Sequence, residues 1–427
     1  MRVALAYGKG QLAVDLPGDA TVLEPCYTEG IPDERAAVRQ ALRHPIGTRP
    51  LRDLVAATDH VAIVTTDKTR ATPNHTLLPC LLDELAHVPA ERVTIINGVG
   101  MHRQNTPEEL RAMYGEAIVD RYRCVNHDAH DRAALVELGR TRAGGQILVN
   151  RTYMEASVRI VTGFIEPHFF AGFTGGPKGI MPGICGAPLI MRNHGAAMIA
   201  HPQATWGVTR GNPIFEEMLE VALMTRPAFL LNVALNSRKA ITAVFAGDLV
   251  PAYEAGCRFV KGTAMQGVAS PFDVVVTTNS GYPLDLNLYQ AVKGMAAAAR
   301  IVKPGGAIVV AAECSEGIPD HGSYGKLLQM RDSPAGLLKM IHEPAFASDD
   351  QWQVQIQAMI QEKARVFVHS TLPPEVIRRA QLLPCAEVGE TVRRLAAEAG
   401  PGARIAVLPF GPLTIPYLSS EPQAAAA

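Results

Sequence analysis

The sequence lacks the features expected of a nucleic-acid-binding or membrane-bound protein. Its 40 Lys and Arg residues are balanced by 41 Asp and Glu residues, which leaves a formal net charge of -1 at pH 7. Without a basic excess, nucleic acid and anionic membranes are poor partners. No apolar run reaches membrane-spanning length, and the first residues lack the apolar core of a signal peptide. We therefore expect a cytoplasmic protein that binds neither nucleic acid nor membrane.

Cysteine is scarce, and no two cysteines form a C-x-x-C pair. The seven cysteines are scattered along the chain and odd in number. This pattern argues against a disulfide framework and a cysteine zinc site, because both need cysteines at defined spacings. We expect reduced thiols, as in a cytoplasmic protein.

Strand and helix patterns alternate along most of the chain. Apolar, β-branched runs predict buried strands at 60–66, 92–97, 158–165, 272–278, 305–312 and 365–369. Helical patterns are found at 33–43, 75–87, 214–224, 285–302, 350–362 and 389–399. Thr106 and Glu109 form a capping-box signature at the start of a further helix, and residues 3–17 are typical of a hairpin. Such alternation predicts parallel α/β sheets.

The 427 residues correspond to two or three domains. The best linker by composition is 262–271, after which the strand–helix alternation restarts. The sequence therefore predicts two Rossmann-like α/β domains with the active site in the interdomain cleft. The first is expected to span 1–265, joined by about 400–420, and the second to span 270–399.

Functional groups follow three separate predicted strands. Asp67 and Arg70 follow the first, His102 and Arg103 follow the second, and the third ends at Glu166 and His168. Parallel α/β sheets place ligands beyond the carboxyl ends of their strands. Three such clusters suggest a shared crevice.

A glycine-rich stretch, 162–186, continues from the third of these strands. It contains Gly172, Gly175, Gly176, Gly179, Gly183 and Gly186. So many glycines would let backbone approach a ligand closely, at a large entropic cost. Within the stretch, Lys178 is either a solvated turn residue or an anion clamp or covalent anchor. The spacing around it matches neither a Walker A motif nor a Rossmann fingerprint.

The individual side chains leave alternatives open. His102 and His168 are either general acid/base groups or histidines bonded to backbone or packed on aromatics. His194 is either a helix-end cap or a metal ligand. Asp67 and Arg70 form either a salt bridge at a helix start or a site for a carboxylate or phosphate.

In the second half of the chain, Tyr289 and Lys293 stand at i and i+4 of one predicted helix, with Gln290 between them. A Tyr-x3-Lys pair also occurs in short-chain dehydrogenases, whose N-terminal nucleotide fingerprint is missing here. Trp352 is on these grounds a half-buried aromatic. These signals indicate an α/β enzyme with an anion-binding, histidine-bearing cleft.

Several motifs together resemble the nickel-dependent lactate racemase family. The matching segments are Asp67-Lys-Thr-Arg-Ala-Thr-Pro73, Gly100-Met-His-Arg103, Glu166-Pro-His-Phe-Phe-Ala-Gly-Phe-Thr-Gly-Gly-Pro-Lys178, His194 and Asn287-Leu-Tyr-Gln-Ala-Val-Lys-Gly-Met295. They stand in the family's order from the N-terminal Tyr7-Gly-Lys-Gly segment to Trp352. The combination is specific, although no single segment is.

The resemblance implies a nickel-pincer nucleotide, pyridinium-3-thioamide-5-thiocarboxylic acid mononucleotide, as cofactor. Lys178 is similar to the covalent anchor of this cofactor, His194 to the protein ligand of the nickel, and His102 and His168 to two acid/base residues. The cofactor and substrate-carboxylate environment corresponds to Asp67, Arg70, Tyr289, Gln290 and Lys293, with Trp352 beside the substrate. Arg70 and Lys293 are candidates for both cofactor and substrate binding.

Family members racemise or epimerise 2-hydroxy acids, and the chemistry agrees with two histidines. The C2 proton is weakly acidic, so removal of hydride to an electron-poor cofactor is an easier route than proton abstraction. One histidine would take the hydroxyl proton, and the other would return a proton after hydride reaches the opposite face.

Two departures leave the substrate open. Ala71 and Pro177 stand where the family more often has other residues. The substrate is then lactate, a larger hydroxy acid or a sugar acid, and the cofactor-synthesis proteins are expected as transient partners. An NAD-dependent dehydrogenase or epimerase and a non-catalytic small-anion-binding protein are the competing hypotheses.

Overall fold

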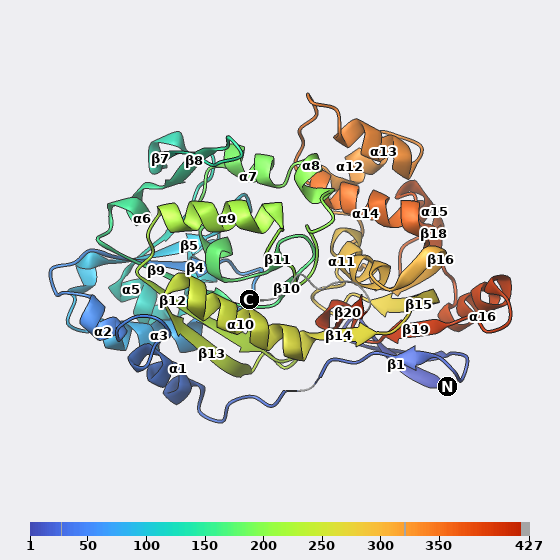
Figure 1. Cartoon of the computed structure of the whole chain (residues 1–427), viewed down its shortest axis with the longest axis horizontal. Helices are drawn as coiled ribbons and strands as arrows, with labels where there is room; N and C mark the ends of the chain where they lie inside the picture. The colour runs from blue at the N-terminus through green and yellow to red at the C-terminus, as the bar shows by residue number, and fades with distance from the viewer. Residues whose placement is uncertain (27, 320–321, 420–427) are drawn as a thin grey trace. The chain divides into compact units, whose positions relative to one another are not determined.

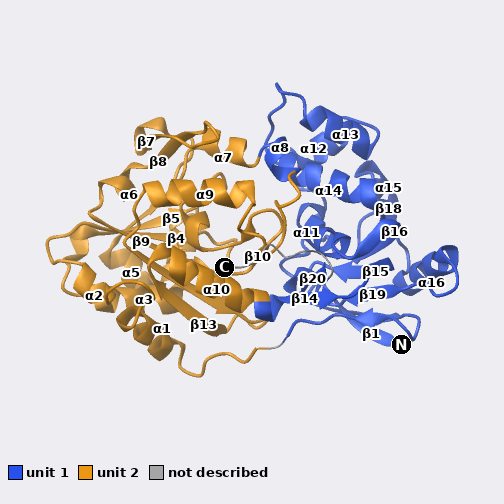
Figure 2. Ribbon diagram, viewed as in Figure 1, with its two compact units in different colours: residues 1–26, 195–200, 262–427 blue, residues 27–194, 201–261 orange. Residues whose placement is uncertain are grey.

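The computed structural model describes residues 1–26, 28–319 and 322–419, and most of its elements are labelled in Figure 1. The chain divides into two compact units (Figure 2). Unit 1 consists of residues 1–26, 195–200 and 262–427, and unit 2 of residues 27–194 and 201–261. The α/β class with two domains is confirmed.

Unit 2 is built on a six-stranded sheet of order β13-β12-β9-β4-β5-β6. Its strands are β4 (Val61–Thr66), β5 (Val93–Gly98), β6 (Arg123–Asn126), β9 (Val158–Phe164), β12 (Phe229–Leu235) and β13 (Ile241–Gly247). All neighbours are parallel except the edge strand β13. The central strands are buried at nearly every position, as expected for a parallel sheet whose two faces are covered.

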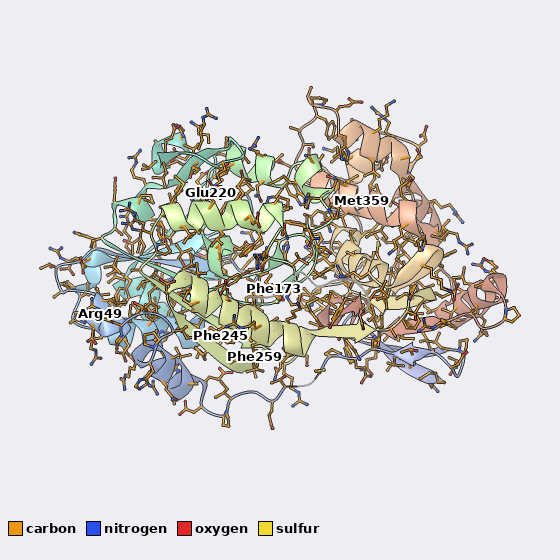
Figure 3. All side chains as sticks on the ribbon, in the orientation of Figure 1. Arg49, Phe173, Glu220, Phe245, Phe259 and Met359 are labelled. Carbon is orange, nitrogen blue, oxygen red and sulfur yellow. The ribbon has the colours of Figure 1, made fainter. Side chains whose placement is uncertain are left out.

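Helices and two hairpins complete unit 2. The helices are α1 (Glu34–Arg43), α2 (Leu51–Leu54), α3 (Asn74–Glu84), α4 (Pro107–Tyr114), α5 (Glu116–Arg121), α6 (Arg151–Glu155), α7 (Ala187–Asn193), α9 (Pro213–Met224) and α10 (Leu249–Ala264). The hairpins pair β7 (Leu135–Arg140) with β8 (Gln146–Asn150), and β10 (Pro167–His168) with β11 (Gly172–Phe173). Phe259 of α10 packs on Phe245 of β13, with ring centroids 5.8 Å apart (both labelled in Figure 3). Residues 262–264 of α10 are assigned to unit 1.

Unit 1 contains a second six-stranded sheet, of order β18-β17-β16-β15-β19-β3, in which all neighbours are parallel. Its strands are β3 (Thr21–Val22), β15 (Phe272–Thr278), β16 (Val302–Ala311), β17 (Arg365–His369), β18 (Leu383–Pro384) and β19 (Ile405–Leu408). The helices are α8 (Ala196–Ile199), α11 (Leu288–Ala299), α12 (Tyr324–Leu328), α13 (Pro334–Ile341), α14 (Gln351–Lys363), α15 (Pro374–Arg379) and α16 (Val388–Ala399).

Two predicted boundaries differ from the compact units. The hairpin predicted at 3–17 is present as β1 (Arg2–Tyr7) and β2 (Gly10–Asp15), but its buried Val3 and Leu5 belong to the core of unit 1. The stretch about 400–420, expected in the first domain, supplies β19 to the same sheet. Ile405–Leu408 is buried throughout, so it suits an interior strand.

The predicted linker 262–271 is also structured. It contains the end of α10 and strand β14 (Met265–Val268), which pairs in parallel with β20 (Ile415–Leu418). Its glycine content suggested a linker, yet the pairing with a distant strand decides its conformation.

Among the helices of residues 1–26, 28–319 and 322–419, none has both the length and the apolar character that a membrane crossing requires.

Candidate active site

The three strands that the sequence singled out are neighbours in the sheet of unit 2. β4 pairs in parallel with β5 on one side and with β9 on the other, so their carboxyl ends lie at one edge of the sheet. Asp67 follows β4, the loop to His102 follows β5, and His168 follows β9. Six predicted site residues therefore belong to unit 2, namely Asp67, Arg70, His102, His168, Lys178 and His194.

Asp67 and His102 form a hydrogen-bonded pair across this edge. The His102 Nδ1 atom lies 2.6 Å from Asp67 Oδ2, and Thr69 donates to Asp67 Oδ1 through its hydroxyl (2.6 Å) and its backbone N–H (3.1 Å). The Asp67 side chain is 4% exposed, whereas that of His102 is 53% exposed. Burial alone would raise the pKa of Asp67, but the hydrogen bond and charge of His102, with Arg70 and Thr69, lower it to about 2.

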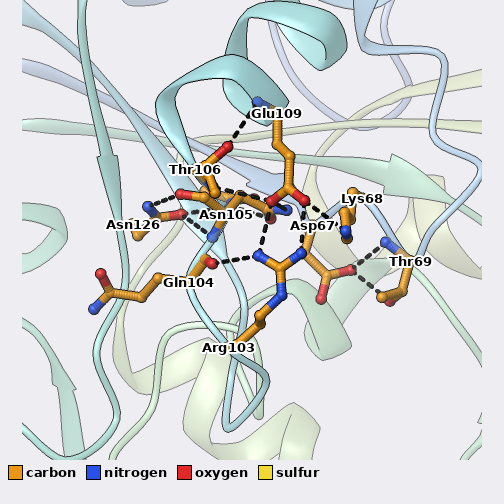
Figure 4. Close-up of polar contacts among 10 residues, drawn as sticks. Asp67, Lys68, Thr69, Arg103, Gln104, Asn105, Thr106, Glu109 and Asn126 are labelled. Carbon is orange, nitrogen blue, oxygen red and sulfur yellow. Dashed lines mark hydrogen bonds and ion pairs between the residues drawn. The ribbon is translucent and has the colours of Figure 1, made fainter.

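A second carboxylate at this edge, Glu109, binds two neighbouring cations (Figure 4). Arg103 donates to both of its oxygens, at 2.9 and 2.6 Å, and Lys68 donates at 2.5 Å. These bonds lower the pKa of Glu109, with that from Arg103 the largest cause. Glu109 also completes the predicted capping box with Thr106. The Arg70 guanidinium, by contrast, makes no hydrogen bond or ion pair with any residue that the structure describes, although its charge acts on Asp67.

The glycine-rich stretch is packed tightly within unit 2. A Cβ atom at Gly176 would lie 2.3 Å from the ring of Tyr253, and one at Gly183 would lie 2.1 Å from the Gly179 carbonyl oxygen. A Cβ atom at Gly172, Gly175, Gly179 or Gly186 would likewise lie closer than 3.0 Å to protein atoms. At each of these six positions the space that a side chain would need is taken by other protein atoms. They allow the stretch to fold against its own unit.

Asn232 holds this stretch from within the sheet. It is fully buried on β12, and its Oδ1 accepts a hydrogen bond from the Gly176 N–H at 2.7 Å. Gly176 opens a 3-10 turn, Gly176–Gly179, that carries the half-buried Lys178. Sequence reasoning missed Asn232, and the signal was one polar residue inside the apolar strand Phe229–Leu235.

His168 lies in the small hairpin β10–β11 and is buried. Its Nδ1 accepts hydrogen bonds from the backbone N–H groups of Ala171 (3.2 Å) and Phe170 (3.5 Å). Phe170 meets the His168 ring edge to face at 4.5 Å and the His194 ring at 5.0 Å. The aromatic packing considered for His168 is therefore present, and it brings His168 and His194 to the same side chain.

His194 ends helix α7 and is buried. Its Nδ1 lies 3.1 Å from the Ile190 carbonyl oxygen, which can only accept, so Nδ1 carries the hydrogen and Nε2 carries a lone pair. Burial and the charge of Lys178, only partly opposed by the Ile190 hydrogen bond, lower the pKa of His194 to about 3. A neutral imidazole with one nitrogen fixed by a carbonyl is the form that binds a metal.

Nothing within the described residues forms a metal site from protein groups alone. In residues 1–26, 28–319 and 322–419, no three His, Cys, Asp or Glu side chains are grouped so as to hold a metal ion. Asn193, the residue before His194, is held by a buried hydrogen-bond network. Its Nδ2 donates to the Glu217 carboxylate (2.9 Å), and Thr141 donates to the same carboxylate (2.7 Å).

The remaining predicted residues lie in unit 1. Tyr289, Gln290 and Lys293 are on α11, and Trp352 is on α14. The Trp352 Nε1–H donates to the Tyr289 hydroxyl at 3.3 Å, and Gln353 donates to the Tyr289 carbonyl. The structure thus brings Tyr289 and Trp352 together.

Comparison with known proteins gives consistent matches. The family model described as lactate racemase N-terminal domain matches residues 7–207, and that described as lactate racemase C-terminal domain matches residues 268–415. A lactate racemase of Thermoanaerobacterium thermosaccharolyticum is 36% identical over 417 residues, covering 96% of this chain and 97% of that protein. One from Lactiplantibacillus plantarum is 37% identical over 381 residues, covering 88% and 90%.

Solved structures agree. The lactate racemase apoprotein from Thermoanaerobacterium thermosaccharolyticum superposes with a TM-score of 0.91 at 34% identity, covering 97% of this chain and all of that one. A Thermotoga maritima protein superposes with a TM-score of 0.69 at 19% identity, covering 92% of this chain and all of that one. The second match concerns the fold alone.

Proposed function

The chain belongs to the lactate racemase family and is an isomerase, and we propose that it inverts C2 of a 2-hydroxy acid with His102 and His168 as its acid/base groups. The observation that carries this proposal is the edge of the unit 2 sheet. There, β5 and β9 flank β4 and bring His102 and His168 to the same end, and Asp67 is bonded to His102 at 2.6 Å.

We propose that Lys178 and His194 hold a nickel-pincer nucleotide. Such a group, when bound, supplies an electron-poor acceptor for the hydride on C2. His194 suits the role of metal ligand because the bond between its Nδ1 and the Ile190 carbonyl fixes the neutral tautomer that carries the ring lone pair on Nε2. Lys178 suits the role of tether because it is near enough for its charge to act on His194.

Arg70 is our candidate for binding the substrate carboxylate in unit 2. Of the three cations that follow β4 and β5, Lys68 and Arg103 are bound by Glu109. The Arg70 guanidinium makes no such bond within the described residues, so it can take a carboxylate in bidentate fashion. For unit 1 we propose that Tyr289, Gln290, Lys293 and Trp352 serve the cofactor and substrate.

Lactate is the substrate to test first, because the relatives that match over most of their length are named lactate racemases. Larger hydroxy acids and sugar acids follow, since Ala71 and Pro177 differ from the residues more common in the family. We also propose the cytoplasm as the setting, which the seven free cysteines support, and cofactor-synthesis proteins as transient partners.

The test is expression in a host that makes the cofactor, followed by intact mass, nickel content and chiral analysis of each hydroxy acid. We expect an adduct that maps to Lys178, about one nickel per chain, and racemisation of at least one substrate. An unmodified Lys178 in that host would overturn the cofactor assignment. Tight NAD binding without nickel would instead favour the dehydrogenase hypothesis.

A further inference from the structure

Asp67 is held in place independently of His102. Its carboxylate is 4% exposed, and its Oδ1 accepts both the hydroxyl and the backbone N–H of Thr69. This turn leaves Oδ2 directed at the His102 ring, 2.6 Å from Nδ1. The more exposed His102 therefore receives its orientation from the more buried Asp67.

The pair also fixes which ring nitrogen of His102 carries a hydrogen. An ionised carboxylate can only accept, so Nδ1 must be the donor in this bond. The lowered pKa of Asp67 keeps that carboxylate ionised across the ordinary pH range. In the neutral ring, Nε2 is then the nitrogen with the lone pair.

The hydrogen bonds of His168 fix the opposite ring tautomer. Its Nδ1 accepts from the N–H groups of Ala171 and Phe170, so in the neutral ring the hydrogen must be on Nε2. The β10–β11 hairpin builds this arrangement from backbone alone, because Pro167 and His168 pair with Phe173 and Gly172.

From this contrast we infer that Asp67 is a positioning residue that sets His102 as the base of the resting protein, whereas His168 begins as a hydrogen-bond donor through Nε2. The assignment of roles rests on the proposed function. The tautomers themselves rest on the hydrogen bonds and can be tested without the cofactor.

The substrate O–H bond breaks, and its proton forms an N–H bond at His102 Nε2; the cofactor of the proposed function, when bound, would accept the C2 hydrogen with its electron pair as hydride. The ring becomes an imidazolium whose charge lies against the Asp67 carboxylate, which stays ionised. Substrate whose hydroxyl faces His102 is therefore the form that the resting protein deprotonates.

The decisive experiment is ¹⁵N NMR of the protein labelled in its histidines, without cofactor, at a pH where the rings are neutral. We expect His102 in the Nδ1–H form and His168 in the Nε2–H form. In the Asp67→Asn variant, His102 should shift toward the Nε2–H form while His168 stays unchanged. Asp67→Glu should restore part of the Nδ1–H population.

Glu109→Gln is the matched control, because it removes a carboxylate at the same edge that does not contact His102. It should leave both tautomers unchanged. An Nε2–H form of His102 in the unaltered protein, or no change in Asp67→Asn, would overturn the inference whether or not the protein racemises any substrate.

The loaded protein gives a second readout. Asp67→Asn should lower kcat by about 10²–10⁴-fold with little change in KM and with nickel retained. Equal losses in Asp67→Asn and Asp67→Glu, with the His102 tautomer unchanged, would reduce Asp67 to a structural residue. Absence of turnover in the unaltered, loaded protein would instead contradict the proposed function and leave the NMR result standing.

Discussion

The two units surround their candidate residues with different kinds of polar group. In unit 2 carboxylates bind the side chains that follow β4 and β5, as in the Asp67–His102 pair and the Glu109–Arg103 pair. In unit 1 the partners are neutral amides on α14, where Gln351, Gln353, Gln355 and Gln357 are all buried. A neutral amide both donates and accepts without the cost of desolvating a charge.

Alternate positions on a helix point to different sides, so the glutamines of α14 reach different neighbours. Gln353 donates to the Tyr289 carbonyl on α11, Gln355 to the Ala196 carbonyl on α8, and Gln357 to the Ala380 carbonyl after α15. The helix that carries Trp352 is thus bonded on several sides. The stability of unit 1 should therefore respond to the loss of an amide, whereas that of unit 2 should respond to packing, pH and salt.

The largest effect on stability is expected from Gly176→Ala in unit 2. Gly176 has a φ of +50°, and its Cβ would lie 2.3 Å from the Tyr253 ring. Backbone strain and overpacking together should cost about 2–5 kcal/mol. Gly144→Ala is the control, because its φ of +86° is similar but open space surrounds its Cβ; it should cost only about 1–2 kcal/mol. Equal losses in urea unfolding would show that packing of the glycine-rich stretch is unimportant.

Gln357→Leu should give the next largest loss and tests the amides of unit 1. Gln357 accepts the Tyr324 hydroxyl and donates to the Ala380 carbonyl, all within the buried part of the unit. Leucine would leave both groups without this partner, at about 2–4 kcal/mol. The exposed Gln329→Leu should change the free energy of unfolding by less than about 0.5 kcal/mol. If both variants unfolded alike, the buried amides would not be what holds α14.

Much of unit 2 could be predicted from the sequence because its signals are local. The strands that end before Asp67, His102 and His168, and the capping box of Thr106 and Glu109, depend on residues close together in the chain. The pairing of Asp67 with His102 could not be predicted from the sequence, because it depends on how two loops 35 residues apart approach each other. The placement of residues 1–26 was missed for the same reason, since β3 pairs with β19 near the other end of the chain.

The burial of the glutamines of α14 could not be predicted from the sequence either. Their alternating pattern, Gln351 to Gln357, is visible in the sequence but contradicts the usual rule that glutamine is exposed. Only the carbonyls that they meet on neighbouring elements explain their burial. Asn232 is the equivalent case in unit 2, where the Gly176 N–H is the partner.

A smaller, pH-dependent effect is expected at His127 of unit 2. His127 is fully buried, donates from Nε2 to the Cys185 carbonyl and accepts at Nδ1 from Asn150. Burial lowers its pKa, although the Cys185 bond and Asp128 oppose the shift. Because the unfolded chain protonates first, near pH 6.5, this residue stabilises the fold fully above that pH and progressively less below it.

The measurement is the free energy of unfolding between pH 7.5 and 5. The unaltered protein should lose up to about 2 kcal/mol more than His127→Gln as the pH falls from 6.5 to 5. His194, whose pKa is lowered chiefly by burial, contributes to both proteins alike. Parallel pH profiles would mean that folding does not lower the pKa of His127.

The smallest effect on stability is expected from Glu109→Gln. Its dependence on salt concentration distinguishes the charged partners of unit 2 from the neutral amides of unit 1. Glu109 and its partners Arg103 and Lys68 are accessible to solvent, with side-chain exposures of 23%, 58% and 44%. Dissolved ions screen exposed charges, with a Debye length of about 10 Å at 0.1 M salt. The small loss in the free energy of unfolding on removing the charge should therefore shrink as the salt concentration rises. The loss in Gln357→Leu involves no charge and should persist. If the loss in Glu109→Gln stayed constant as salt rose, the hydrogen bonds that Glu109 accepts from Asn105 and Thr106, rather than its charge, would hold this edge together. Charge would then not distinguish unit 2 from unit 1.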